Sequence, residues 1–236
     1  DEMCFIIMGQ AKELLFKSIY YELYNARIRV IADDLPNASI ILNRTKEMLL
    51  LLTKFWDVLA TIRPEGFKSF RDHLNVASGQ QSFMFRHVEF ILGNKNKAMA
   101  SVHKNVEHIY PAIQENLESP SFYDEVIRLL NKRGFEIAPE CLNRDWAERY
   151  KSHESIENAW LQIYRDPQPS NDLYLFGELL TELADIFARY RFQHYTTVER
   201  ILGFKPGTGG SAGVNWLKTM AAHRFFPELW SMRTDL

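Results

Sequence analysis

The sequence has 236 residues, of which 46% are apolar and 25% charged, and its formal net charge is −2. This is ordinary globular composition, and such a small net charge gives no indication of a nucleic-acid or membrane partner. The apolar runs, such as residues 48–52, are far shorter than the roughly 20 residues that cross a bilayer. The two cysteines, Cys4 and Cys141, form no Cys-x-x-Cys pattern, which favours a reducing, cytoplasmic location over a disulfide framework.

Apolar residues recur at helical spacing in several segments of the chain. The first segment runs from about Asp1 to about Ile31, where apolar residues at steps of three, four or seven give one apolar face. Pro36 and Asn37 interrupt this pattern. A second stripe covers residues 48–59 and ends before Pro64, and a third covers residues 81–92 and ends at Gly93 and Asn94.

The second half of the chain carries clear helix start and stop signals. Ser119 and Pro120 indicate a helix start, because they place a capping residue before a proline in the first turn, and Gly134 indicates its end. A long helix is predicted from about Asp172 to about Leu202, stopping at Gly203. Strand signals are nearly absent, since no run of alternating β-branched residues and no Asn-Gly hairpin occurs. The sequence therefore predicts an all-α fold.

Histidine spacing limits the kinds of metal site. None of the seven histidines lies four residues from another, and no His-Glu-x-x-His pair occurs, so a zinc centre is not indicated. A single histidine can still hold a haem iron axially, because the porphyrin supplies the other four ligands. His194 is the candidate. It precedes the Gly-rich segment 203–213, which joins two predicted helices and therefore fits neither a dinucleotide fingerprint nor a P-loop. Taken alone, a helical histidine is more often a surface or core residue.

Three separated segments resemble the tryptophan 2,3-dioxygenase superfamily. They are residues 1–17, with Phe-Ile-Ile-Met-Gly-Gln; residues 78–96, with Ser-Gly-Gln-Gln-Ser-Phe-Met-Phe-Arg-His-Val-Glu; and residues 192–214, with Phe-Gln-His-Tyr-Thr-Thr-Val. A weaker match covers residues 225–229. The resemblance implies an all-α helical bundle of the tryptophan/indoleamine 2,3-dioxygenase type, in a single domain over residues 1–236, with a haem pocket between long helices.

The resemblance also implies roles for matching positions. His194 aligns with the axial ligand of haem b, for which O2 is the co-substrate. Arg86 aligns with the residue that binds the substrate carboxylate, which a guanidinium can hold by two parallel hydrogen bonds. Without the resemblance, an ion pair with a nearby glutamate would explain Arg86. Phe5 aligns with an aromatic wall of the indole pocket, and its alternative is core packing.

The Gly-rich segment supplies further predicted contacts. Thr208 aligns with a residue that contacts the amino-acid head of the substrate, although a loop threonine also commonly bonds its own backbone. The glycines of this segment would let it fold closely over a ligand, and Gly209 and Gly210 are assigned to the cofactor.

Two positions depart from the family pattern. The tryptophan dioxygenases carry a distal histidine on the first helix, and the alignment places Gly9 there, although glycine inside a helix costs about 1 kcal/mol relative to alanine. Gln80 stands where the family usually has an aromatic residue. Gly9 would remove the group that holds the indole N–H and would open room for a larger or rotated substrate.

Three functions are consistent with these residues. The first is a haem-dependent oxygenase that inserts one oxygen at indole C2 or C3 of tryptophan or a substituted tryptophan, giving an oxindole or hydroxyindoline as in natural-product branches of the family; Gly9 favours it. The second is an ordinary tryptophan 2,3-dioxygenase that forms N-formylkynurenine. The third is a non-catalytic haem-binding protein, which retention of His194, Arg86 and Thr208 argues against. Because the family is tetrameric, a homo-oligomer, tetramer or dimer, is expected.

Overall fold

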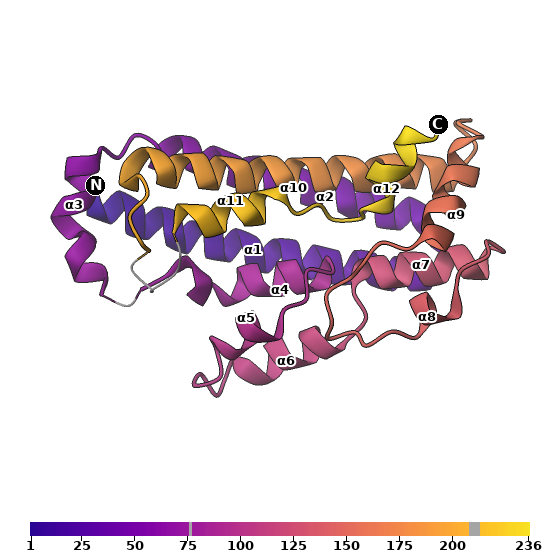
Figure 1. Ribbon diagram of the computed structural model, residues 1–236, viewed down its shortest axis with the longest axis horizontal. Helices are drawn as coiled ribbons and strands as arrows, with labels where there is room; N and C mark the ends of the chain where they lie inside the picture. The colour runs from indigo at the N-terminus through magenta and orange to yellow at the C-terminus, as the bar shows by residue number, and fades with distance from the viewer. Residues whose placement is uncertain (76, 208–212) are drawn as a thin grey trace.

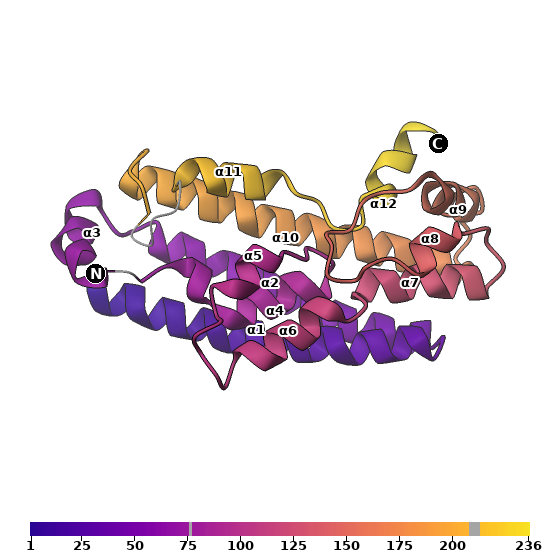
Figure 2. The ribbon, with the colours of Figure 1, turned by 60° about the horizontal axis from the view of Figure 1, so that its bottom comes forward.

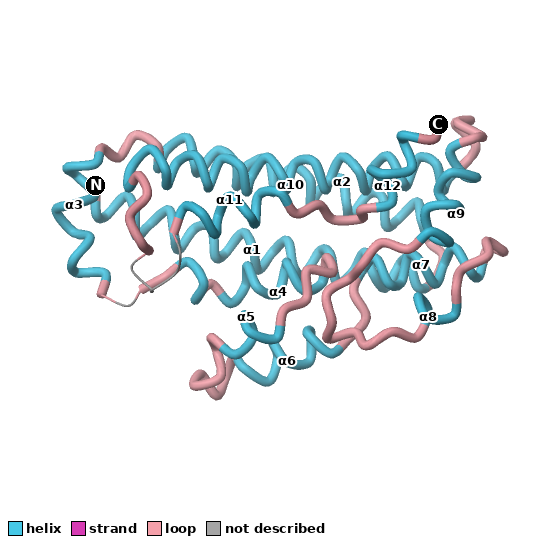
Figure 3. The backbone as a smooth tube through the Cα atoms, in the orientation of Figure 1, coloured by secondary structure: helices cyan, strands magenta, loops and turns pink. Residues whose placement is uncertain are grey.

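The computed structural model describes residues 1–75, 77–207 and 213–236. Three long helices lie side by side: α1 (Glu2–Ile31), α2 (Leu35–Leu59) and α10 (Asp172–Leu202) (Figure 1). α2 packs against both α1 and α10, and the two termini lie at opposite ends of the bundle (Figure 2). The described residues form helices and loops and contain no strand, which confirms the all-α prediction (Figure 3).

Shorter helices surround the three long ones. α4 (Phe83–Ile91) and α7 (Phe122–Lys132) pack against α1, and α11 (Val214–Ala222) packs along α10. α3 (Pro64–Arg71) covers the end of the bundle at which the chain begins (Figure 1). The remaining short elements are α5 (Lys97–Ser101), α6 (Tyr110–Glu118), α8 (Pro139–Leu142), α9 (Glu154–Tyr164), α12 (Glu228–Ser231) and the 3₁₀ turns η1 (Asp72–Leu74), η2 (Gly79–Gln81) and η3 (Met232–Thr234).

The turn between α1 and α2 is formed by two aspartates. Asp33 has a φ of +59°, a conformation that aspartate tolerates better than most residues. Asp34 caps α2, because its carboxylate accepts from the backbone N–H of Asn37 at 3.3 Å. Pro36 lies in the first turn of α2, where a missing N–H costs nothing. The predicted interruption is therefore confirmed, but α2 begins at Leu35 and not near residue 48.

The start of α7 also differs from the prediction. Ser121, not Ser119, is its N-cap, and Ser121 and Asp124 bond each other's backbone N–H groups in a capping box. Ser119 instead follows α6, where its hydroxyl donates to the Glu115 carbonyl at 2.6 Å. The sequence correctly predicted a serine cap for this helix, but the cap is Ser121, two residues after the predicted Ser119.

The other predicted helix limits agree with the structure. α4, α7 and α10 end shortly before Gly93, Gly134 and Gly203. One large buried apolar cluster extends from Phe16 on α1 to Met232 in η3. Both cysteines are free thiols. No described helix combines the length and apolar character that crossing a bilayer requires.

Candidate active site

Most of the residues predicted for the site lie toward one end of the bundle. α1 begins at this end and α2 and α10 finish there, while α3 covers it (Figure 1). Residues 203–207, which follow α10, lie at the same end (Figure 2). The sequence thus brings residues from both halves of the chain together at this place.

His194 lies on α10, and its ring stacks on the indole of Trp56 from α2. The ring centroids are 4.2 Å apart and the planes differ by 11°. Although part of the residue reaches solvent, burial of the ring, followed by the charge of Lys12, lowers the pKa of His194 to about 3. The imidazole is therefore neutral near pH 7. It has no hydrogen-bond partner among the described residues, so a ring nitrogen is free to bind a ligand.

Lys12 from α1 completes this group of side chains. Its Nζ lies 3.7 Å from the centroid of the Trp56 ring, which is cation–π geometry. Burial lowers the pKa of Lys12 to about 8. A nearby ammonium disfavours protonation of an imidazole. The three side chains thus connect α1, α2 and α10 and keep His194 in the form that binds metals.

An aromatic cluster forms where α1 meets α3. Phe5 lies 5.6 Å from Phe67 and 5.5 Å from Phe70 between ring centroids, and the latter two lie 5.0 Å apart. Phe67 and Phe70 are buried, whereas Phe5 is half-buried. The cluster offers an apolar aromatic surface of the kind that contacts an indole ring. The role of Phe5 as a wall of the indole pocket stays a prediction.

Gly9 follows Phe5 by one helical turn on α1. It is exposed, and a Cβ added to it would meet no heavy atom within 4 Å. Close packing therefore does not require glycine here, although glycine destabilises a helix interior by about 1 kcal/mol relative to alanine. The position that the resemblance assigns to the distal histidine is open space in this structure. Gln80, the second departure from the family pattern, lies in η2, where its backbone N–H is bound by Ser78.

Arg71, at the end of α3, is a candidate site residue that the sequence analysis did not identify. Its Nη2 donates to the carbonyl of Pro206 at 2.7 Å, and its Nε is buried without a partner among the described residues. A guanidinium with an unsatisfied N–H beside an aromatic cluster is suited to binding a carboxylate. The spacing of Phe67, Phe70 and Arg71, which places all three on one face of a helix, could have indicated Arg71. The sequence analysis did not predict this helix.

Arg86 lies instead in a buried polar cluster on α4. It is 2% exposed and pairs with Glu89, which also pairs with Arg191 of α10 at 2.6 Å and accepts from Asn94 at 3.3 Å. Burial would raise the pKa of Glu89, but the charges of Arg86 and Arg191 outweigh burial and hold that pKa below its usual value. The ion pair considered as the alternative for Arg86 is therefore present. Its predicted contact with the substrate carboxylate stays a prediction.

The ends of the Gly-rich segment lie against each other. Gly213 has a φ of +60°, and a Cβ there would lie 2.6 Å from the carbonyl oxygen of Lys205, so only glycine fits. The segment connects α10 to α11, which confirms its predicted place between two helices. Thr208, Gly209 and Gly210 lie outside the described residues, and their roles stay predictions.

The donor chemistry of this end of the bundle fits haem. Haem iron takes a ligand from the protein, and the neutral, unpartnered imidazole of His194 would be able to hold it. Aromatic side chains such as Trp56 and Phe5 supply apolar surface at the same end, which suits a flat macrocycle.

Comparisons with known proteins identify the family. The sequence matches the profile of a protein family described as tryptophan 2,3-dioxygenase over residues 1–236. Tryptophan 2,3-dioxygenases from Polaromonas sp. and Burkholderia cenocepacia are each 46% identical over 236 residues, and one from Cupriavidus necator is 44% identical. The alignments cover all of this chain and 80%, 76% and 80% of these relatives. The chain therefore belongs to the tryptophan 2,3-dioxygenase family and is a haem-dependent oxidoreductase.

Proposed function

We propose that the protein is a tryptophan 2,3-dioxygenase that uses haem b and O2 to open the indole ring of L-tryptophan to N-formylkynurenine. The observation that carries the proposal is the neutral, unpartnered imidazole of His194 at the end of the bundle that also holds Phe5 and Arg71. His194 would hold the iron, and haem, when bound, supplies the activation of O2. Relatives that are 44–46% identical carry the dioxygenase name, which favours ring opening over insertion of a single oxygen.

The protein's own part in this reaction is binding and orientation. The aromatic cluster would hold the indole ring by apolar contact. Arg86, as the resemblance implies, or Arg71 would bind the substrate carboxylate, because the Nε of each is buried without a partner among the described residues. Thr208 would contact the amino-acid head, and Gly209 and Gly210 would lie against the cofactor. No strong general base is required of the chain, so the absence of a distal histidine at Gly9 is compatible with turnover.

The product identifies the reaction directly. Ferrous, haem-loaded protein is incubated with tryptophan under isotopically labelled O2, and the product is weighed by mass spectrometry. We expect incorporation of both oxygen atoms and the absorption of N-formylkynurenine. Incorporation of one oxygen, with the spectrum of an oxindole or hydroxyindoline, would contradict ring opening.

Arg71→Leu is expected to weaken tryptophan binding by about 2 kcal/mol or more, because the carboxylate loses a charge-assisted hydrogen bond. Affinity is read from the change in the haem absorption spectrum as tryptophan is added. Tryptamine, which lacks the carboxylate, should bind the variant and the unaltered protein with nearly equal affinity.

Arg86→Leu is the matched comparison for that experiment. It leaves Glu89 with one guanidinium fewer, so it should lower the free energy of unfolding, and it should weaken tryptophan binding only if Arg86 contacts the carboxylate. The opposite pattern, with affinity lost in Arg86→Leu and kept in Arg71→Leu, would assign the carboxylate to Arg86.

The open space at Gly9 supports a second candidate function. In it, the same site inserts a single oxygen at C2 or C3 of tryptophan or of a substituted tryptophan, because the ring is not held through its N–H. Methylated tryptophans are the substrates that distinguish this candidate, since the missing side chain leaves room for an added group.

Gly9→His is expected to shift the product ratio toward ring opening with any substrate that gives both products. The open space admits the side chain, and an imidazole there can hold the indole N–H. Gly9→Ala is the control, because it restores helix propensity without adding a hydrogen-bonding group. An unchanged ratio in Gly9→His would mean that this position does not determine the outcome.

We also propose that residues 1–236 form one domain, in the cytoplasm, within a homo-oligomer. Exposed apolar side chains recur every seven residues along α1, at Ile7, Leu14, Tyr21 and Ile28. A seven-residue apolar repeat is typical of a helix that packs along another helix. Sedimentation velocity should therefore show a dimer or tetramer, and a monomer at micromolar concentration would contradict this proposal.

A further inference from the structure

The core-facing side of α1 carries a lysine where an apolar residue would be expected. Steps of three or four residues along this side connect residues that are all buried and apolar: Phe16, Ile19, Leu23, Ala26 and Val30. Continued toward the start of the helix, the same steps reach Lys12, Gly9 and Phe5. Lys12 therefore interrupts the apolar side of α1 where this helix enters the candidate active site.

An ammonium group in this place destabilises the fold unless it gains a partner. Burying a charge without an ion pair or hydrogen bond is unfavourable, and burial lowers the pKa of Lys12 to about 8 with no carboxylate acting against that shift. The amine is still mostly protonated at pH 7. Within the described residues its Nζ has no hydrogen bond or ion pair, and its contact is the cation–π contact with Trp56. A side chain that breaks the apolar pattern without such a partner indicates a functional position.

The carboxylates next in sequence to this group are already occupied. Glu13, beside Lys12, accepts from the hydroxyl of Ser82 and from a backbone N–H of α4 at 2.9 Å. Asp57, which follows Trp56 on α2, accepts from the side-chain amide of Gln193 at 2.6 Å. Neither of these carboxylates is therefore a free partner for Lys12.

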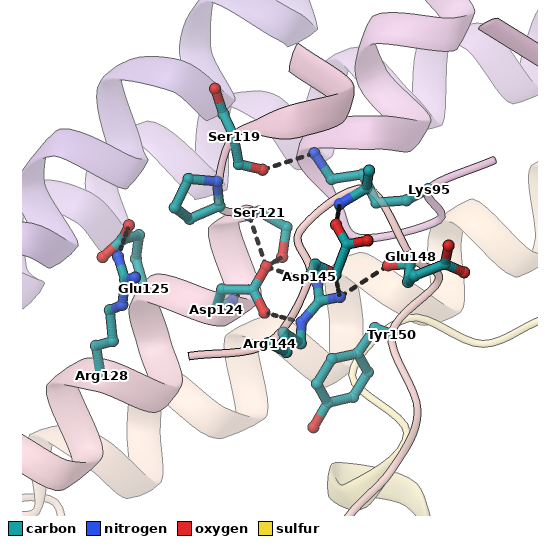
Figure 4. A network of polar contacts seen from close by, with 12 residues as sticks. Lys95, Ser119, Ser121, Asp124, Glu125, Arg128, Arg144, Asp145, Glu148 and Tyr150 are labelled. Carbon is teal, nitrogen blue, oxygen red and sulfur yellow. Dashed lines mark hydrogen bonds and ion pairs between the residues drawn. The ribbon is translucent and has the colours of Figure 1, made fainter. Parts of the chain in front are cut away.

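A second buried lysine shows how this chain satisfies such a group elsewhere. Lys95 is 2% exposed, and its Nζ donates to the backbone carbonyls of Asn116 and of Ser119, the latter at 2.9 Å (Figure 4). Both acceptors belong to the protein, so Lys95 requires no ligand. Lys12 lacks such acceptors among the described residues, and this difference points to an acceptor that a ligand supplies.

The surroundings of Lys12 indicate which ligand that is. The Trp56 ring that lies beneath its Nζ also stacks on His194, and the charge of Lys12 acts on the pKa of His194. Lys12 is thus close to the residue that would hold the iron. Haem carries two propionate carboxylates at the edge of the porphyrin, and an ammonium forms charge-assisted hydrogen bonds with carboxylates.

The substrate carboxylate is the other possible source of the same chemistry, but it has candidates of its own. Arg71 and Arg86 each have a buried Nε without a partner among the described residues. The aromatic cluster that would hold the indole ring includes Phe5, which lies seven residues, or about 10 Å along the helix, before Lys12. The position of Lys12 beside Trp56 and His194 therefore favours a haem propionate.

We infer that Lys12 binds a propionate carboxylate of the haem whose iron His194 holds. The inference rests on the proposed function, because it places haem at His194. It adds a residue of this chain that selects the charged edge of the porphyrin.

The rate at which two porphyrins leave the protein tests the inference. The chain is loaded with haem or with haem dimethyl ester, whose propionates are uncharged, and the released porphyrin is trapped by excess apomyoglobin at pH 7 while the Soret band is followed. We expect the ester to leave the unaltered protein about tenfold faster than haem, or faster still, since a charge-assisted hydrogen bond is lost. In Lys12→Met, haem and ester should leave at nearly the same rate.

Two further variants make this result specific. Lys12→Arg keeps the charge and should retain a slower loss of haem than of ester. Lys17→Met removes an exposed lysine from the same helix and should behave as the unaltered protein does. Methionine suits the apolar side of α1, so Lys12→Met should keep its helices, which circular dichroism checks.

The outcomes separate this inference from the proposed function. An unchanged preference for haem over its ester in Lys12→Met overturns the role of Lys12 and leaves the proposed function standing. Weaker tryptophan binding in Lys12→Met with an unchanged rate of haem loss also overturns it, because the carboxylate at Lys12 would then belong to the substrate. A full Soret band in His194→Ala would instead contradict the proposed function itself.

Discussion

His194→Ala is expected to purify with about tenfold less haem, or lower still, because removing a direct ligand should cost at least as much as the 10–100-fold loss seen when a supporting residue is removed. Among the described residues assigned to the site, His194 has a neutral imidazole with a free nitrogen that would hold the iron. The measurement is the Soret absorbance per mole of protein after purification. Circular dichroism establishes whether the helices are retained.

Two further variants make this result specific. His194→Gly leaves space in which free imidazole can replace the missing ring, so added imidazole should restore the Soret band. His73→Ala removes an exposed histidine in η1 and should retain haem as the unaltered protein does. A full Soret band in His194→Ala would show that another residue holds the iron, and the proposed function would then lose its main support.

Glu89→Gln is expected to lower the free energy of unfolding by about 3–5 kcal/mol, because it leaves two buried guanidinium groups without their carboxylate. Arg86 and Arg191 are 2% and 5% exposed, so water cannot replace Glu89 as their partner. Chemical denaturation followed by circular dichroism measures the difference. A loss below about 1 kcal/mol would mean that the pair is screened as surface pairs are.

The pH dependence provides a second readout for Glu89. The pKa of Glu89 in the folded protein is held below the usual value. Its contribution to the free energy of unfolding is therefore complete above the carboxyl pKa of the unfolded chain. That contribution is lost as the pH falls through the lowered pKa of the folded protein. The difference in free energy of unfolding between the unaltered protein and Glu89→Gln should therefore become smaller at acid pH. Replacing the three residues together by apolar side chains, as Arg86→Met, Glu89→Leu and Arg191→Met, should recover part of the loss.

Helical periodicity predicted the long helices well and the short ones poorly. α1 and α10 follow their predicted limits, because 30 or more residues of regular apolar spacing leave little room for another structure. The start of α2 was missed because a proline in a first turn and a proline that breaks a helix look alike in sequence. Short helices such as α3 depend on packing and carry too few residues to show a period.

Candidate site residues could be named from the sequence where they lie in long segments that resemble the family, and their roles stay predictions. His194, Phe5 and Gly9 were identified in this way, and the structure shows their surroundings. The ion pairs around Arg86 could not be predicted from the sequence. Its partner Glu89 also pairs with Arg191, which lies 102 residues from Glu89 in the chain. Arg71 was missed for a similar reason, since its partner Pro206 is 135 residues away.

The bond between Arg71 and Pro206 has a consequence for how the site responds to its substrate. A guanidinium has five N–H donors and this bond uses one, so Arg71 can hold the Pro206 carbonyl and an amino acid at the same time. If Arg71 binds the substrate carboxylate, occupancy by an amino acid and the placement of Pro206 behind α10 are coupled through one side chain. Thermodynamic linkage requires that coupling to act equally in both directions: whatever displaces the chain behind α10 also changes the affinity for the amino acid.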